Sequence, residues 1–212
     1  FVIDTEHATH LLLSDAGGVL GMVALDHENI SFTDLITVDK TRTYREISFE
    51  NTPVEILERT IDSVNAVERA IDAGRITLAA DSLGASQTML DMAVSYSKDR
   101  KQFNRVIGSF QAVKHMCAEM ASELEPCYSL VWHAAHSFDN DEDNSKLMAC
   151  HAKSHVSEIS KEISKKATEV HGGMGFTDLL GLHYWFKRIG LNRQLLGAPE
   201  VVRAEAAKIQ GF

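Results

Sequence analysis

The chain has 212 residues, of which 44% are hydrophobic and 24% are charged, a composition typical of folded globular proteins rather than disordered ones. Lys and Arg number 21 and Asp and Glu 30, and the net charge of −9 argues against nucleic acid or an anionic membrane surface as a partner. No apolar run approaches the roughly 20 residues of a membrane span, and we expect no signal peptide before Phe1. The three cysteines form no CxxC pair, so we expect reduced, buried thiols in a cytoplasmic protein.

The first quarter of the chain predicts antiparallel strands. Residues 11–13 and 19–25 are short apolar runs, with Gly17-Gly18 as the expected turn between them. Further on, Ile47 and Phe49 alternate with polar residues, the period of two that a half-buried strand shows. These strands are too few to close a barrel, so we expect that part of this β-domain is missing from the chain.

After Pro53 the spacing of apolar residues becomes helical. Steps of three and four predict long helices over about 67–100, 109–138 and 149–170, and shorter ones over 179–191 and 199–209. We expect Ser109 to cap the second of these helices. The acidic run 139–143 lacks the glycine and distal Glu of a calcium loop and is expected to be a solvated connector. The sequence therefore predicts a mainly α chain, with a β segment over 1–56 and a helical bundle over 57–212.

Two further patterns bear on chemistry. His151 and His155 share a helix face with the spacing of zinc ligands, but Ala152 stands where the HExxH pattern has Glu, so we expect no metal site. The cluster Gly172-Gly173-Met174-Gly175 lies between two expected helices. Such glycines either let backbone N–H groups approach a phosphate or a ring, or simply end a helix at Gly172. The cluster alone leaves both interpretations open.

Three motifs, in this order, resemble the C-terminal half of the acyl-CoA dehydrogenase family. Arg100-Lys101-Gln102-Phe103 is similar to the family's R-x-Q-F-G, with Asn104 in place of the glycine. Phe110-Gln111 opens a segment similar to F-Q-A-x-x-H, and Glu169 opens one similar to Q-x-x-G-G-x-G-F/Y-T, where glutamine is usual. The resemblance implies the family's C-terminal four-helix bundle, preceded by a truncated part of its middle β-domain.

The resemblance also implies an activity and a cofactor. Members of the family oxidise an acyl-CoA thioester to the 2,3-enoyl-CoA, with FAD as the hydride acceptor, and pass the electrons to an electron-transfer flavoprotein. Much of the FAD site serves the neighbouring subunit, so we expect a homo- or hetero-tetramer that acts on fatty or steroid acyl-CoA. The residues carried over as FAD-binding are Arg100, Gln102, Phe103, Phe110, Gln111, Glu169, Gly172 and Gly173.

Asp72 and Arg75 correspond to the family's D-x-x-R, which contacts coenzyme A. A guanidinium is a suitable partner for the phosphate or adenine of that substrate. An Asp and an Arg three residues apart on a helix can equally form an ordinary surface ion pair. Both interpretations remain open from the sequence.

The chain departs from the family at the catalytic base. Most members carry a glutamate before Gly-Thr in the final loop, where this chain has Leu196; some relatives carry it on the D-x-x-R helix, where this chain has Gly74. Neither residue can accept a proton. Our hypothesis is a subunit that completes a shared FAD site while a partner supplies the base, with weak or no FAD retention by these 212 residues alone. The alternatives are a self-sufficient enzyme with its base at Glu200 or Asp72, and a non-catalytic binding or structural protein.

Overall fold

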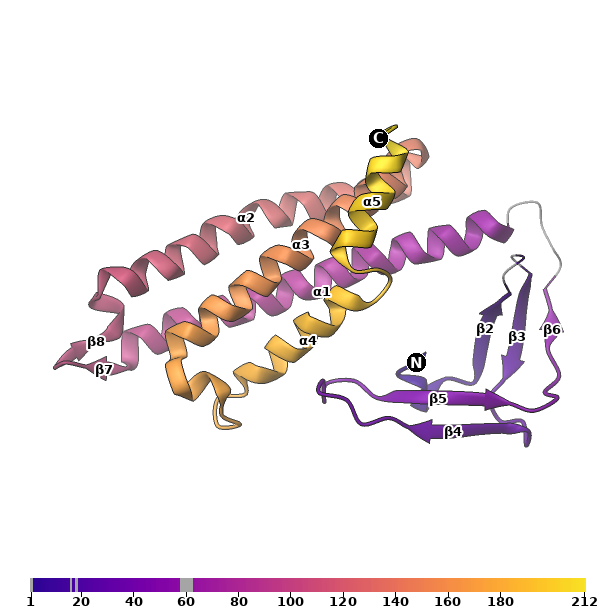
Figure 1. Cartoon of the computed structure of the whole chain (residues 1–212), viewed down its shortest axis with the longest axis horizontal. Helices are drawn as coiled ribbons and strands as arrows, with labels where there is room; N and C mark the ends of the chain where they lie inside the picture. Colours follow the sequence, from indigo (N-terminus) through magenta and orange to yellow (C-terminus); the bar gives the residue numbers. More distant parts are fainter. Residues whose placement is uncertain (1, 16, 18, 58–62) are drawn as a thin grey trace. The chain divides into compact units, whose positions relative to one another are not determined.

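The computed structural model describes residues 2–15, 17, 19–57 and 63–212, without the side chains at 63, 64 and 142 (Figure 1). The chain divides into two compact units, Phe1–Ala70 and Ile71–Phe212. This division falls inside the first long helix, whereas we expected a boundary between residues 56 and 57. Gly18, part of the expected turn, lies outside the described residues.

The first unit contains two antiparallel sheets of three strands each, in the orders β1-β5-β4 and β2-β3-β6. The elements are β1 Val2–Ile3, η1 Thr5–His7, β2 His10–Ser14, β3 Leu20–Ala24, β4 Ile30–Asp34, β5 Tyr44–Phe49 and β6 Glu55–Ile56. Val23, Leu25 and Tyr44 are buried. The strands expected in this part of the chain are confirmed, and β2 pairs with β3 as predicted.

The regular elements of the rest of the described chain are helices, apart from one short hairpin that follows the C-terminal end of α1 (Figure 1). The elements are α1 Ser63–Asp99, β7 Lys101–Gln102, β8 Arg105–Val106, η2 Ile107–Ser109, α2 Gln111–Asn140, α3 Glu142–His171, η3 Gly172–Phe176, α4 Leu182–Gln194 and α5 Pro199–Ile209. The mainly α fold is therefore confirmed, and α5 has the predicted bounds.

Three of the expected helix ends are wrong. Ser109 does not cap α2, because its hydroxyl donates to the carbonyl of Val106 at 2.7 Å and α2 begins two residues later. The acidic run is not a connector, since α2 continues to Asn140 and α3 starts at Glu142, with only Asp141 between them. The helix expected over 179–191 starts at Leu182, after Gly181 in a left-handed conformation with φ 66°.

The core of the bundle is built from four helices, and alanines at many of its contacts let the helices approach closely. Its buried members include Ile76, Ala79, Leu83 and Met89 on α1, Met120, Leu124, Cys127 and Ala134 on α2, Ala149, Ala152, Val156 and Ile163 on α3, and Leu182 and Ile189 on α4. A smaller cluster of Cys150, Val202 and Ala206 packs α5 against α3.

A fully buried lysine on α3 supports the end of α4. The ammonium of Lys153 donates to the backbone carbonyls of Asn192 and Arg193 and to the hydroxyl of Ser157. These three acceptors match its three N–H donors, and the carbonyls belong to the C-terminal turn of α4, where a helix favours a cation. Burial, together with the nearby charges of Arg75 and Arg193, lowers the pKa of Lys153 to about 8.

The described residues offer neither a membrane-spanning helix nor a metal site. None of their helices is both long and apolar enough to cross a bilayer. They contain no group of three or more His, Cys, Asp or Glu side chains that could hold a metal ion. The cysteines are free thiols, and burial raises the pKa of Cys127 and of Cys150 to about 11.

We predict that Lys153→Met removes a pH dependence of stability. The pKa of Lys153 is about 8 in the folded chain and 10.5 when unperturbed, so between these values the unfolded chain binds more protons at this site. The free energy of unfolding of the wild type should therefore rise with pH relative to that of the variant, with a slope approaching about 1.4 kcal/mol per pH unit. Denaturant unfolding from pH 7 to 10 measures this difference between the wild type and the variant. Both chains contain the same cysteines, so the effect of cysteine titration cancels in the difference.

The matched control is Lys165→Met, which removes a half-exposed lysine from the same helix. Its curve should run parallel to that of the wild type. Parallel curves for Lys153→Met as well would contradict the lowered pKa of the buried amine.

Candidate functional site

A pocket of about 430 Å³ lies between the end of α1, the β7-β8 hairpin and the junction of α3 with η3. Arg100 and Gln102 line it from one side, and Glu169, Gly172 and Gly173 line it from the other. Five of the eight predicted cofactor residues, drawn from two motifs 69 positions apart at Arg100 and Glu169, thus meet around one cavity.

Gly172 makes this junction possible. It has φ 59° and ψ −142°, a conformation that side chains disfavour, and its N–H donates to the carbonyl of Glu169. Gly172 therefore ends α3, as the helix-end interpretation of the glycine cluster predicts. A Cβ added at Gly172 or Gly173 would meet no heavy atom within 4 Å, so the backbone of both residues borders open space.

The hairpin explains the departure from the family's motif at Asn104. Gln102 pairs with Arg105 across a two-residue turn, in which Phe103 and Asn104 have φ 53° and 60°. Such a turn needs the left-handed region twice, which Asn tolerates well and Phe poorly. The turn leaves Phe103 exposed at its tip while Gln102 lines the pocket.

The other three predicted cofactor residues do not line the pocket. The rings of Phe103 and Phe110 pack edge to face with centroids 6.1 Å apart, and the guanidinium of Arg105 lies 3.9 Å from the Phe110 centroid. Gln111 begins α2, and its amide nitrogen is 3.4 Å from Nε2 of His115. Phe110 and Gln111 instead lie beside the hairpin, where η2 passes into α2.

Sequence reasoning missed an aromatic pair in the pocket wall. The rings of Tyr96 and His171 stack with centroids 4.5 Å apart, and both residues line the cavity. Nδ1 of His171 lies 2.7 Å from the carbonyl of Ala167, and because a carbonyl only accepts, this nitrogen carries the proton. Tyr96 lies one helical turn before Arg100, so the periodicity of α1 was the available signal.

Gly74 and Leu196, the two positions that the resemblance assigns to the family's base, meet at one place. A methyl group added to Gly74 on α1 would overlap Cδ1 of Leu196, in the turn between α4 and α5. Leu196 has φ 54°, a left-handed conformation that costs a residue with a Cβ roughly 1–2 kcal/mol. The place holds an apolar contact between a leucine and a glycine, and neither residue brings a carboxylate.

Arg75, the residue after Gly74 on α1, holds the turn between α4 and α5 in position. Its Nε donates to the carbonyl of Leu196 at 3.1 Å, and Nη2 donates to the Glu205 carboxylate at 2.8 Å. Asp72 lies 3.5 Å from Nη1, and both members of this pair are buried. The sequence left open a coenzyme A contact or a surface ion pair; the structure places the guanidinium inside the chain.

Electrostatics in this cluster favour the charged forms. Burial by itself lowers the pKa of Arg75, but the carboxylate of Glu205, Cys150 and Asp72 together raise it above its usual value. The hydrogen bond from Arg75 lowers the pKa of Glu205 in turn. The cluster therefore ties α1, α5 and the turn together with full charges at neutral pH.

The two alternative bases are also held in ion pairs. Glu200, at the start of α5, accepts a hydrogen bond of 2.6 Å from Arg193, which also binds Glu158 at 2.7 Å. Its own backbone N–H and then Arg193 lower the pKa of Glu200. Asp72 is buried beside Arg75. Each of the two carboxylates therefore has an arginine as its ion-pair partner.

Comparison with known proteins identifies the second unit. Residues 64–210 match the family model "Acyl-CoA dehydrogenase, C-terminal domain". The chain is 44% identical over 108 residues to the caffeyl-CoA reductase-Etf complex subunit CarC of Acetobacterium woodii, a match that covers 51% of this chain and 28% of CarC. It is 29% identical over 178 residues to the acyl-CoA dehydrogenase IpdE2 of Mycolicibacterium smegmatis, covering 84% of this chain and 54% of IpdE2.

The fold is shared with solved structures. The glutaryl-coenzyme A dehydrogenase complex with glutaryl-CoA superposes with a TM-score of 0.90 at 23% identity, covering 98% of this chain and 56% of that one. At this identity the likeness speaks for the fold alone. The chain matches 28% and 54% of the lengths of the two curated relatives, about half or less of each.

We predict that Gly74→Ala and Leu196→Ala are coupled. Alone, Gly74→Ala places a methyl group against Cδ1 of the partly exposed Leu196 side chain, which must shift, so the change should be neutral or destabilise the chain by up to about 1 kcal/mol. With Leu196→Ala the space opens, and the same change should stabilise α1 by about 0.5–1 kcal/mol, the usual gain of Ala over Gly in a helix. Denaturant unfolding of the four chains in this cycle measures the coupling.

Gly84→Ala is the matched control. Gly84 lies on the same helix, and a methyl group added there meets no heavy atom within 4 Å. It should stabilise the chain equally in both backgrounds. Additive effects of Gly74→Ala and Leu196→Ala would contradict the contact between the two base positions.

Proposed function

Because this chain belongs to the acyl-CoA dehydrogenase family, whose C-terminal domain spans residues 64–210, we propose that it is a subunit of an FAD-dependent acyl-CoA dehydrogenase. In this proposal it completes a flavin site shared between subunits, and a partner subunit supplies the base. The observation that carries the proposal is the single pocket formed by Arg100, Gln102, Glu169, Gly172 and Gly173.

The donor set of this pocket suits the adenosine-diphosphate part of FAD. The Arg100 guanidinium can pair with pyrophosphate oxygens, and the Gln102 amide can both donate and accept. Gly172 and Gly173 border open space with no side chain in the way, which allows close approach of a phosphate to the backbone. The stacked rings of Tyr96 and His171 add a flat aromatic surface. Glu169 is the one member that opposes an anion, since it is a carboxylate where the family has glutamine.

The contribution of this chain to the reaction is then binding and orientation. FAD, when bound, supplies the hydride acceptor for oxidation of the acyl group. The removal of the α-proton needs a carboxylate within hydrogen-bond reach, and the contact between Leu196 and Gly74 offers none. The backbone N–H of Leu196 can still polarise a thioester carbonyl, because that donor does not depend on the side chain. Arg75 holds the turn that carries it.

The expected assembly follows from the same reasoning. A site divided between subunits requires at least a dimer, and the family suggests a homo- or hetero-tetramer with an electron-transfer flavoprotein as the electron acceptor. The name of CarC, a subunit of a caffeyl-CoA reductase-Etf complex, supports this partner class. The free thiols agree with action in the cytoplasm.

Co-expression of the full-length protein with candidate paralogous subunits tests the proposal. We expect bound flavin and acyl-CoA-dependent reduction of a dye in the mixture, and neither when this protein is produced alone. A fully active homomer would refute the missing base, and Glu200→Gln in that homomer would show whether Glu200 serves instead. Absence of flavin from every combination would favour a non-catalytic role.

We predict opposite effects of two substitutions in the pocket. Glu169→Gln should tighten ADP binding and Arg100→Gln should weaken it, each by roughly two- to fivefold, the range for an exposed charge interaction. Isothermal titration of the flavin-free co-expressed assembly with ADP measures both constants. Lys101→Gln is the control, since it removes a charge next to Arg100 from a residue that does not line the pocket. Equal effects of Arg100→Gln and Lys101→Gln would mean that only net charge matters.

A further inference from the structure

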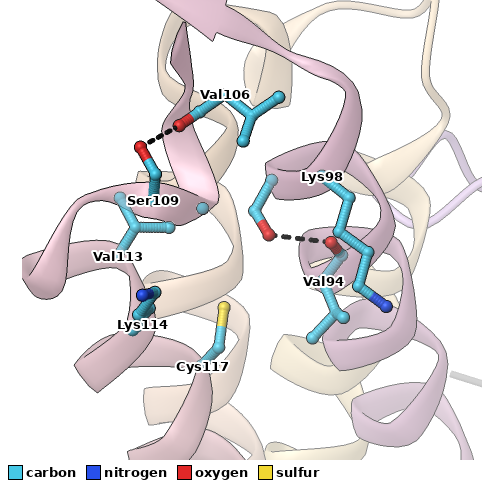
Figure 2. A pocket seen from close by; sticks show the side chains of 9 residues that line it. Val94, Lys98, Val106, Ser109, Val113, Lys114 and Cys117 are labelled. Atoms are coloured by element: carbon cyan, nitrogen blue, oxygen red, sulfur yellow. Dashed lines mark hydrogen bonds between the residues drawn. The ribbon is translucent and has the colours of Figure 1, made fainter.

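A second cavity, of about 380 Å³, lies between the last turns of α1 and the first turns of α2. Figure 2 shows Val94 and Lys98 on one side and Val113, Lys114 and Cys117 on the other. Gly108 closes one end: a Cβ there would lie 2.8 Å from the carbonyl oxygen of Ser97, so only glycine lets η2 rest on α1 at this point.

This cavity is separate from the pocket described above, and the two share no lining residue. Val94, Ser97 and Lys98 line the second cavity from α1, whereas Tyr96 and Arg100 line the first. At 3.6 residues per turn these two sets lie on nearly opposite faces of the helix. A ligand can therefore bind in one cavity without touching the residues that line the other.

The walls of the second cavity have few free polar groups. Val94, Val106 and Val113 are apolar, and burial raises the pKa of the Cys117 thiol, which marks poorly solvated surroundings. The hydroxyls of Ser97 and Ser109 donate to the carbonyls of Val94 and Val106 at 2.8 and 2.7 Å, both drawn as dashed lines in Figure 2. Both hydroxyl protons are thus already used, and an apolar ligand body leaves no donor unsatisfied.

The charged groups of the cavity are both cations. Lys98 and Lys114 line it from its two sides, and within the described part of the chain neither ammonium is paired with a carboxylate. In a chain with a net charge of −9, two unpaired lysines beside one apolar cavity favour a ligand with a negative head. The volume is near the low end of the range of about 300–1,000 Å³ for ligand pockets, which limits the ligand to a small one.

We propose that this cavity binds a short or medium-chain aliphatic carboxylate, with the chain against the valines and Cys117 and the carboxylate at the cavity mouth, where the exposed side chains of Lys98 and Lys114 supply positive charge. The site is independent of the proposed flavin site, so either can fail without the other. Its ligand carries its charge at one end and needs no hydrogen bond along its length, which matches the distribution of polar groups in the cavity.

Cys117 provides a built-in reporter. It is partly exposed in the cavity, whereas Cys127 and Cys150 are buried, so a maleimide should alkylate Cys117 first. Mass spectrometry of the intact chain follows the rate at pH 8 with increasing octanoate, 1-octanol or octylamine. We expect saturable protection by octanoate, less by octanol and least by octylamine. Octanoyl-CoA should not compete more strongly than octanoate, since the cavity is too small for its nucleotide.

Variants separate the cavity from general surface effects. Lys98→Gln and Lys114→Gln should each weaken octanoate protection by roughly two- to fivefold, the range for an exposed ion pair, and the double variant should weaken it further. Lys208→Gln, which removes an exposed lysine from α5, should leave it unchanged. Chemical shifts of the Gly108 and Val113 amides on octanoate titration give a second readout that does not depend on the reactivity of Cys117.

Three results would overturn the proposal. The first is the absence of both protection and shift changes up to millimolar octanoate. The second is equal protection by octanoate and octanol, or protection unaffected by the double lysine substitution, which would indicate nonspecific apolar binding. The third is protection that rises with protein concentration and without any ligand, which would mean that a second copy of the chain covers the cavity.

Discussion

Two buried cations hold the turn on which the chemistry of this fold depends. Lys153 binds the last carbonyls of α4, and Arg75 binds the carbonyl of Leu196 a few residues later. A buried ammonium or guanidinium is costly unless hydrogen bonds satisfy it, and here backbone oxygens and carboxylates do so. Because these residues lie on α1, α3 and α5, the conformation of the turn depends on the packing of these helices. The left-handed backbone of Leu196 persists within this frame.

The turn held by these two cations also contains Leu196, one of the two positions that the resemblance assigns to the base. Leu196 and Gly74 stand 122 positions apart, yet their atoms meet in one spot. Two positions that look like alternatives in sequence are thus one position in space, reached from α1 or from the turn after α4. A leucine over a glycine fills that spot with apolar contact while the supporting hydrogen bonds remain. This arrangement is the one on which the proposed role rests, in which a partner subunit removes the proton.

The end of α1 serves two different surfaces. One face presents Tyr96 and Arg100 to a pocket with polar donors and glycine backbone, and the opposite face presents Val94 and Lys98 to a smaller apolar cavity. The β7-β8 hairpin and η2 connect the two, and Gly108 allows the close approach that shapes the second. Residues within one helix turn can thus line two separate cavities, because helical periodicity directs neighbouring residues to different sides of the helix.

Local patterns in the sequence determined much of this protein. Periods of two and of three to four placed its strands and helices, and motifs around Arg100 and Glu169 predicted residues that line one pocket. Helix ends such as Ser109 and the acidic run were misjudged, because capping depends on which carbonyl a hydroxyl finds in the folded chain. Only tertiary structure decided that the Arg75 guanidinium reaches Glu205 and the carbonyl of Leu196, and that Gly74 meets Leu196. Those contacts join residues far apart in the chain, and no local spacing carries information about them.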